Sequence, residues 1–212
     1  MRTPSLHRTV ALMLAGLGTV LCDRPIAYVL NGPVWAPSTM RYTVNPANQD
    51  VPPAGISPAL AIAANAWRVQ SNSSFSFSFL GESAQTTNTN DGVNLVMFRN
   101  ASSGSAIATT YWWSSGNRII DADIVFWDGG FRFFTGSNGC SNGFHVEDIA
   151  AHEFGHALGL GHSASTAATM YATTASCNTG NRVLDADDIA GVLALYPPTG
   201  PLAPPTGLRF VR

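Results

Sequence analysis

Hydrophobic and polar residues alternate along several short segments in the first two thirds of the chain. Residues 75–79 read FSFSF, a strict two-residue period that predicts a half-buried β-strand with its aromatic rings facing inward. Further strands are expected at residues 41–44, 93–98, 107–111 and 119–126, and a short one at 28–30. Polar stretches at 81–92 and 114–117 separate these segments. The pattern therefore predicts a series of short strands joined by polar loops and turns.

Three helices are expected among these strands. Leu60, Ala64 and Trp67 recur at helical spacing after Ser57-Pro58, where serine suits the helix cap and proline the first helical turn. A second helix is expected at residues 146–158 and a third at 186–196, where two prolines stop it. The buried face of the second helix is expected to consist of Val146, Ala150, Phe154 and Ala157.

Composition narrows the class of protein. The chain has 212 residues, of which 45% are hydrophobic, enough for the core of one domain with short appendages. Only 11% are charged and the net charge is −2, and no arginine-rich run or basic patch occurs. We therefore expect no nucleic-acid partner and no binding to anionic membranes.

The first 22 residues have the composition of a secretory leader. Arg2 and Arg8 provide a positive start, and residues 10–21 form an apolar run that is too short to span a bilayer. We expect a secreted, extracellular or periplasmic protein with no stable membrane insertion after the leader is cleaved. The alternatives are a buried helix and a lipoprotein anchored at Cys22, although Leu21 matches a lipobox poorly.

Two cysteines remain once the leader is removed. Cys140 and Cys177 lie on either side of the segment that carries most of the histidines. In an exported protein such a pair is expected to form a disulfide, and two free thiols are the alternative. A disulfide would connect the two sides of that segment.

The most informative segment is HEFGHALGLGH, residues 152–162. His152 and His156 are four residues apart and project from one face of a helix, where they can bind one metal ion together. Gly159 permits a left-handed turn that would return His162 as a third ligand. Three protein ligands leave one position of a tetrahedral Zn²⁺ open for water, and Glu153 can act as the base on that water. The pattern predicts one catalytic zinc ion.

The extended motif, with a methionine following it at Met170, resembles the metzincin zinc endopeptidases and, more narrowly, the matrixins. AAHEFGHALGLGHS at 150–163 and LDADDIAGVLALYP at 184–197 are similar to the matrixin active-site and closing helices. RYTVNP at 41–46, GVNLVMF at 92–98 and AIATTY at 106–111 are similar to matrixin strands, the last to the edge strand LAHAF. The resemblance implies an α+β, zincin-like domain with a twisted, mostly parallel sheet of about five strands, an antiparallel edge strand and three helices.

The resemblance also implies roles around the zinc site. Met170 would form an apolar floor below the metal, although methionine is also a common core residue. Asp187 and Asp188 would support the base by hydrogen bonds, although they also suit a helix N-terminus as simple charges. A peptide substrate would pair with the edge strand in extended form. The residues expected to bind it are Ala106, Ile107, Ala108, Thr109, Thr110 and Tyr171.

The chain departs from the matrixin pattern in three places. Thr109 stands where LAHAF has a histidine that binds a structural zinc ion, so a second zinc site is not expected. The latency peptide PRCG-x-PD is absent from the sequence. Asp121, Asp123 and Asp128 lie on or beside one strand and could take part in a Ca²⁺ site, although they do not reproduce the family's calcium pattern. The alternative is that Asp121 and Asp123 face solvent. His145 has no spacing partner and is expected at the surface.

These observations predict a secreted, monomeric zinc endopeptidase that acts on proteins or peptides. Its expected divisions are a leader at 1–22, an N-terminal segment at 23–40, the protease domain at 41–197 and a proline-rich tail at 198–212. The end of that tail resembles the first strand of a fibronectin type III module, and a plain disordered end is the alternative. A non-catalytic, metal-stabilised binding module and a maturation protease with one dedicated target are the competing functions.

Overall fold

A computed structural model describes residues 26–199 and shows one mixed five-stranded sheet. Its strands are β2 (Thr39–Asn45), β3 (Ser76–Glu82), β4 (Asn94–Phe98), β5 (Ala108–Ser115) and β6 (Arg118–Phe126). They lie in the order β3-β2-β4-β6-β5; all neighbours are parallel except β5, which pairs antiparallel with β6 at one edge. The expected α+β fold with an antiparallel edge strand is confirmed. The expected leader and most of the tail lie outside the described residues.

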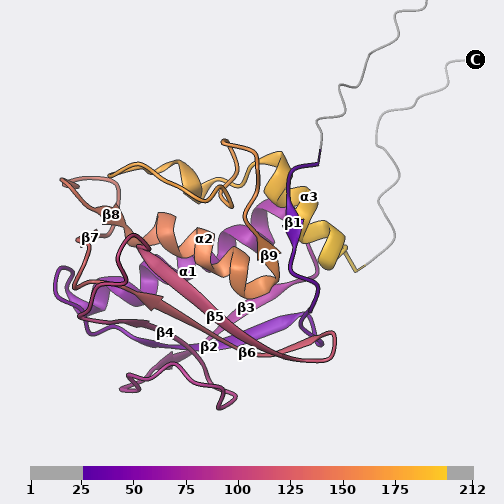
Figure 1. The fold of residues 1–212 in the computed structure, drawn as a ribbon, viewed down its shortest axis with the longest axis horizontal. Coiled ribbons are helices and arrows are strands. Elements are labelled where there is room, and N and C mark those ends of the chain that lie inside the picture. The colour runs from indigo at the N-terminus through magenta and orange to yellow at the C-terminus, as the bar shows by residue number, and fades with distance from the viewer. Residues whose placement is uncertain (1–25, 200–212) are drawn as a thin grey trace, which may run out of the picture.

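Two helices cover one face of this sheet, as Figure 1 shows: α1 (Pro53–Ser71) and α2 (Val146–Leu158). The third, α3 (Ala186–Leu195), lies beside the two-residue strand β1 (Val29–Leu30), which pairs antiparallel with β9 (Leu160–Gly161). A second small sheet joins β7 (Phe133–Phe134) to β8 (Phe144–His145), and η1 (Gly180–Arg182) is a single 3₁₀ turn. No helix within residues 26–199 has both the length and the hydropathy needed to cross a bilayer.

Helix α1 begins one turn earlier than the sequence suggested. Pro53, not Ser57-Pro58, occupies its first turn, so Pro58 lies inside the helix. Ile56 is fully buried, and burying its side chain stabilises the additional turn by about 2 kcal/mol. That gain offsets much of the helical hydrogen bond that Pro58 removes.

Strand β3 also differs from the expected pattern. It begins at Ser76 and continues to Glu82, and its aromatic residues are not all buried. Phe75 is buried, but Phe79 is 42% exposed. Phe79 lies beside Ala61 and Asn65 of α1 in an open hollow, and β3 is an edge strand with no further strand beside it. The alternation in FSFSF could not reveal that this ring lies at the rim of the sheet.

The second face of the sheet is covered by the loop 83–93, and this overturns one expectation. Asp121 and Asp123 do not face solvent, because both are 0% exposed. Asp121 accepts hydrogen bonds from the backbone N–H groups of Asp91 and Gly92, and Asp123 accepts from those of Thr89 and Leu95. These two carboxylates therefore hold the loop against β6.

The helix layer depends on a close approach at Gly155 in α2. A Cβ atom there would collide with Met170 Sδ and would lie 2.7 Å from Cζ2 of Trp67, a residue of α1. Trp67 is 1% exposed, and its indole N–H donates to the carbonyl oxygen of Ala151 at 2.9 Å. Only a residue without a side chain lets α1 and Met170 pack this closely on α2.

Gly155→Ala is therefore expected to destabilise the protein. Alanine in a helix is usually more stable than glycine by roughly 0.5–1 kcal/mol, but overpacking a core costs about 1–3 kcal/mol. We expect a net loss in the free energy of unfolding, measured by urea denaturation of the zinc-loaded protein. A higher urea midpoint in this variant would contradict the packing described above.

Asp123→Ala is expected to lower the free energy of unfolding by about 1–3 kcal/mol, because two amide donors lose their buried acceptor. Asp91→Ala is the matched control, since Asp91 lies in the same loop but is exposed. We expect the control to change stability by about 0.5 kcal/mol or less. Equal urea midpoints for the two variants would show that Asp123 does not hold the loop.

Candidate active site

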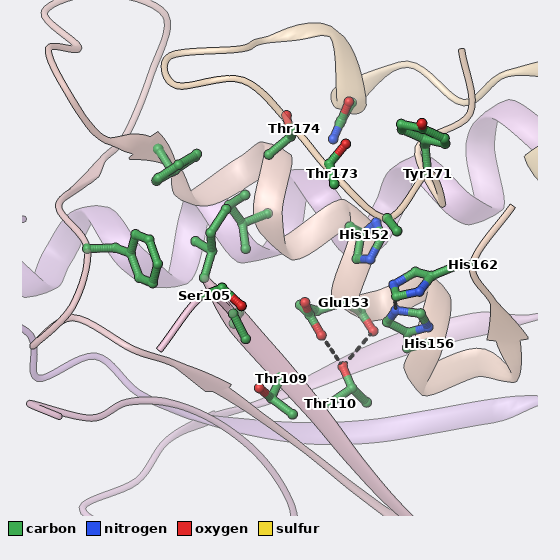
Figure 2. A pocket seen from close by; sticks show the side chains of 18 of the residues that line it. Ser105, Thr109, Thr110, His152, Glu153, His156, His162, Tyr171, Thr173 and Thr174 are labelled. Carbon is green, nitrogen blue, oxygen red and sulfur yellow. Dashed lines mark hydrogen bonds between the residues drawn. The ribbon is translucent and has the colours of Figure 1, made fainter. Parts of the chain in front are cut away.

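Helix α2 places three functional side chains of the motif. It spans the predicted residues, with Glu147 and Asp148 in its first turn, and ends at Gly159, whose φ of +118° is left-handed. The chain then turns through β9 and returns His162 to the helix. Figure 2 shows His152, His156 and His162 facing a common space, with the Glu153 carboxylate beside it. The turn expected from Gly159 is therefore present.

The three imidazole rings form a set of nitrogen donors suited to one metal ion. One nitrogen atom of each ring lies within 4.8 Å of the other two, and Nε2 of His156 is 3.2 Å from Nε2 of His162. Nδ1 of His152 lies 2.7 Å from the Thr169 carbonyl oxygen, and Nδ1 of His156 lies 2.8 Å from that of Leu160. Because a carbonyl oxygen only accepts, each Nδ1 carries the hydrogen, and Nε2 keeps its lone pair for a metal.

Burial keeps the rings of His152 and His156 uncharged. Desolvation lowers the pKa of His152 to about 4, and desolvation together with the neighbouring His152 lowers that of His156 to about 4. A metal ligand must be a neutral imidazole at working pH. The site therefore fits Zn²⁺, which prefers nitrogen and sulfur donors.

The two aspartates of α3 act at different places from those expected. Asp188 accepts hydrogen bonds from the backbone N–H groups of Thr169 and Met170, at 2.7 and 3.0 Å, and does not reach Glu153. Because the Thr169 carbonyl oxygen faces His152, Asp188 supports a histidine of the triad and the turn that carries Met170. The Glu153 carboxylate instead accepts from Thr110 of β5, so the sequence resemblance alone placed the support wrongly.

Asp187 anchors the N-terminal part of the domain. Its carboxylate accepts from the backbone N–H groups of Ala27 and Tyr28 and from the hydroxyl of Ser163. The segment before β2 is also held by Trp35, whose indole N–H donates to the Ala157 carbonyl oxygen at 2.8 Å. The bond from Ser163 fixes the chain immediately after His162.

Glu153 is buried, at 5% exposure, and burial raises the pKa of its carboxyl group. Among the described residues, the side chain that hydrogen-bonds to its carboxylate is Thr110 of β5, with 2.6 Å between Oγ1 and Oε2. The sequence pattern assigned Thr110 only to backbone contact with substrate and missed this role of its hydroxyl. A threonine in place of the second alanine of LAHAF was the available signal.

A cavity of about 590 Å³ adjoins the triad and contains the expected substrate residues. One side is the free edge of β5 and the residues before it, from Ser105 to Thr110. The other side is the loop that begins at Tyr171 and includes Thr173 and Thr174 (Figure 2). Apolar side chains between the two walls are Ile107, Phe131, Phe144 and Ile149.

Two covalent or ionic contacts fix the loop that forms the second wall. The expected disulfide is present between Cys140 and Cys177, with the Cα atoms 5.6 Å apart. Arg182 donates from Nε to the buried carboxylate of Asp148 and from Nη2 to the Gly136 carbonyl oxygen at 2.7 Å. The wall is thus tied to the first turn of α2 and to the segment before it.

Two further residues are placed by the structure. Met170 is 1% exposed and packs against α2 at Gly155, between His152 and His156 in sequence. His145 is not at the surface as expected: it is 2% exposed, occupies the residue before α2 without a side-chain capping bond, and lies edge-on to Phe134. The short strand pairing of β7 and β8 buries this ring, and single-sequence spacing does not show such pairings.

Comparison with known proteins gives short, high-identity matches. The chain is similar to human matrix metalloproteinase-20, with 50% identity over 58 residues (27% of this chain and 12% of that protein). It is 48% identical to human neutrophil collagenase over 63 residues (26% and 14%), and 49% identical to metalloendoproteinase 1-MMP of Arabidopsis thaliana over 53 residues (25% and 14%). The matches therefore span about an eighth of the length of these relatives.

A family model gives the longer match. The model described as Matrixin covers residues 34–197, which include the sheet, all three helices and the histidine triad. The chain belongs to the matrixin family of zinc metalloendopeptidases.

Proposed function

We propose that this protein hydrolyses peptide bonds in proteins or peptides, with His152, His156 and His162 holding a catalytic Zn²⁺ and Glu153 acting as general base. The observation that carries the proposal is the convergence of three imidazoles beside a buried carboxylate in one cavity. A zinc ion bound there would lower the pKa of a water molecule and polarise a carbonyl group. Met170 would support the triad from below.

The residues of the chain would handle the proton and the substrate. Glu153 would take a proton from water in the cleft and return it to the leaving amine. Its raised pKa suits both steps, since the group must be a base first and an acid afterwards. The backbone of Ala106 to Thr110 would pair with an extended peptide along the free edge of β5.

Side-chain selectivity would come from the cavity between β5 and the loop from Tyr171. Backbone pairing does not depend on sequence, so the pocket must supply discrimination. Ile107, Phe131 and Ile149 give it an apolar lining, which favours an apolar substrate side chain. The disulfide and Arg182 would keep this pocket at a fixed width.

Export and domain organisation form part of the same proposal. A leader at 1–22 would direct the chain outside the cell, where the disulfide of Cys140 and Cys177 is stable. The protease domain would span 41–197, with the chain acting as a monomer. Lipidation at Cys22 and a tail that continues into another module are the alternatives to test by mass spectrometry of the secreted protein.

A calcium site has less support than the zinc site. Asp121 and Asp123 direct carboxylate oxygens at backbone N–H groups, and Asp128 accepts from the N–H of Gln49 at 3.0 Å. Within residues 26–199, the group of three or more metal-binding side chains close enough for one ion is the histidine triad. We therefore propose zinc as the metal that the domain needs.

A non-catalytic binding module is the competing function. Such a module needs the three histidines but not a buried carboxylate beside them, so Glu153 favours the enzyme. A protease dedicated to one target would also use this site but would fail to cleave a general substrate such as casein.

Glu153→Ala is expected to lower kcat on casein-derived peptides by at least about 100-fold, because it removes the general base. Zinc content and melting temperature should stay close to those of the wild type. His156→Ala is the matched variant and should lose both zinc and activity. Wild-type turnover in Glu153→Ala would refute the base, and full zinc occupancy in His156→Ala would refute the ligand.

Metal reconstitution is expected to show one zinc ion per chain. Elemental analysis should give one equivalent, and zinc should raise the melting temperature of the metal-free protein because it binds only the folded site. Millimolar calcium added to the zinc-loaded protein should leave the melting temperature unchanged. Two zinc equivalents, or a clear stabilisation by calcium, would contradict the proposed metal content.

A further inference from the structure

The hydroxyl of Thr110 contacts Glu153, and this contact has no role in the mechanism proposed above. The hydroxyl lies 2.6 Å from Oε2 of Glu153 and 3.1 Å from the backbone carbonyl oxygen of the same residue. Figure 2 shows both contacts, with Thr110 on the strand and Glu153 on the helix above it. The backbone carbonyl oxygen can only accept a hydrogen bond, and so can Oε2 when Glu153 is ionised. The threonine hydroxyl is therefore the donor.

We propose that Thr110 is a positioning residue that fixes the carboxylate of Glu153 for its work as general base. The inference rests on the function proposed above. A separation of 2.6 Å is in the range of hydrogen bonds between a hydroxyl and a charged carboxylate, which are stronger than neutral ones. With Oε2 held in this way, the orientation of the second carboxylate oxygen is fixed as well.

Both partners are carried by rigid elements. Thr110 is paired with Ile124 in the β5–β6 ladder, and its β-branched side chain has few rotamers. Glu153 lies in the middle of α2, which packs against β5. A glutamate has three rotatable side-chain bonds, so a single donor on a fixed strand removes much of the freedom of its carboxylate.

A simpler role for Thr110 predicts different behaviour. If the hydroxyl only fills space and satisfies its own hydrogen bond, valine should replace threonine with little effect on turnover, because the two side chains have the same shape. If it positions the base, valine should reduce kcat and leave KM unchanged, since misplaced catalytic groups slow the chemical step more than they weaken substrate binding.

The experiment compares Thr110→Val with Thr110→Ser, which keeps the donor. Thr43→Val is the control: Thr43 lies on β2 of the same sheet, and its buried hydroxyl has no hydrogen-bond partner. We expect Thr110→Val to lower kcat about 10- to 100-fold with KM within twofold. Thr110→Ser should retain most of the activity, and Thr43→Val should retain all of it, with one zinc per chain in every variant.

Crystal structures of the metal-free variants give a readout that is independent of activity. The Glu153 carboxylate should keep one conformation in Thr110→Ser and adopt another, or several, in Thr110→Val. An unchanged carboxylate in Thr110→Val, or a kcat within twofold of the wild type, would overturn the positioning role. An equal loss of kcat in Thr110→Ser would also overturn it.

Failure of this inference can be told apart from failure of the proposed function. If Glu153→Ala is inactive while Thr110→Val turns over normally, the base stands and only the role of Thr110 is wrong. If Glu153→Ala is as active as the wild type, the proposed mechanism fails, and the inference about Thr110 fails with it.

Discussion

The structure depends on holding three imidazole rings close together. Their Nε2 atoms repel unless a cation lies between them, so the rings need support from behind. His152 and His156 receive it from the carbonyl oxygens of Thr169 and Leu160. The first of these carbonyls belongs to a turn whose N–H groups bind Asp188. Helix α3 thus determines the orientation of a histidine on α2 without touching it.

Two glycines of the motif make this geometry possible for different reasons. Gly159 has a positive φ that a side chain would oppose, and the turn it allows returns His162. Gly155 is helical, and its role is to admit Met170 and Trp67. The first role follows from local spacing alone. The second becomes visible only when helix α1 and the turn after His162 lie next to α2, because neither neighbour is close in sequence.

Features that follow from local spacing were predicted from the sequence, and features that depend on distant neighbours were missed. The bounds of α2 and the spacing of the histidines depend on local geometry, and both were predicted. The mostly parallel sheet with its antiparallel edge strand was implied by the resemblance to matrixins, and the structure confirms it. The sequence missed the burial of Asp121 and His145, the exposed end of β3 and the contacts of Asp188. Each of these depends on a loop or an element that is distant in sequence. Single-sequence periodicity carries no information about such cover.

Thr109 and Thr110 of strand β5 both depart from the matrixin pattern LAHAF, and their side chains make different contacts. Consecutive residues of a strand face opposite sides of a sheet. Thr109 accepts from the indole N–H of Trp127 at 2.9 Å, and the Arg99 guanidinium lies over that indole and donates to Asn88 of the covering loop. Thr110 faces α2 and donates to Glu153. Thr109 therefore contacts Trp127 on one face of the strand, and Thr110 contacts the base on the opposite face. A one-residue slip of β5 would exchange these partners and disrupt both, so the antiparallel register with β6 is a requirement of the site as well as of the fold.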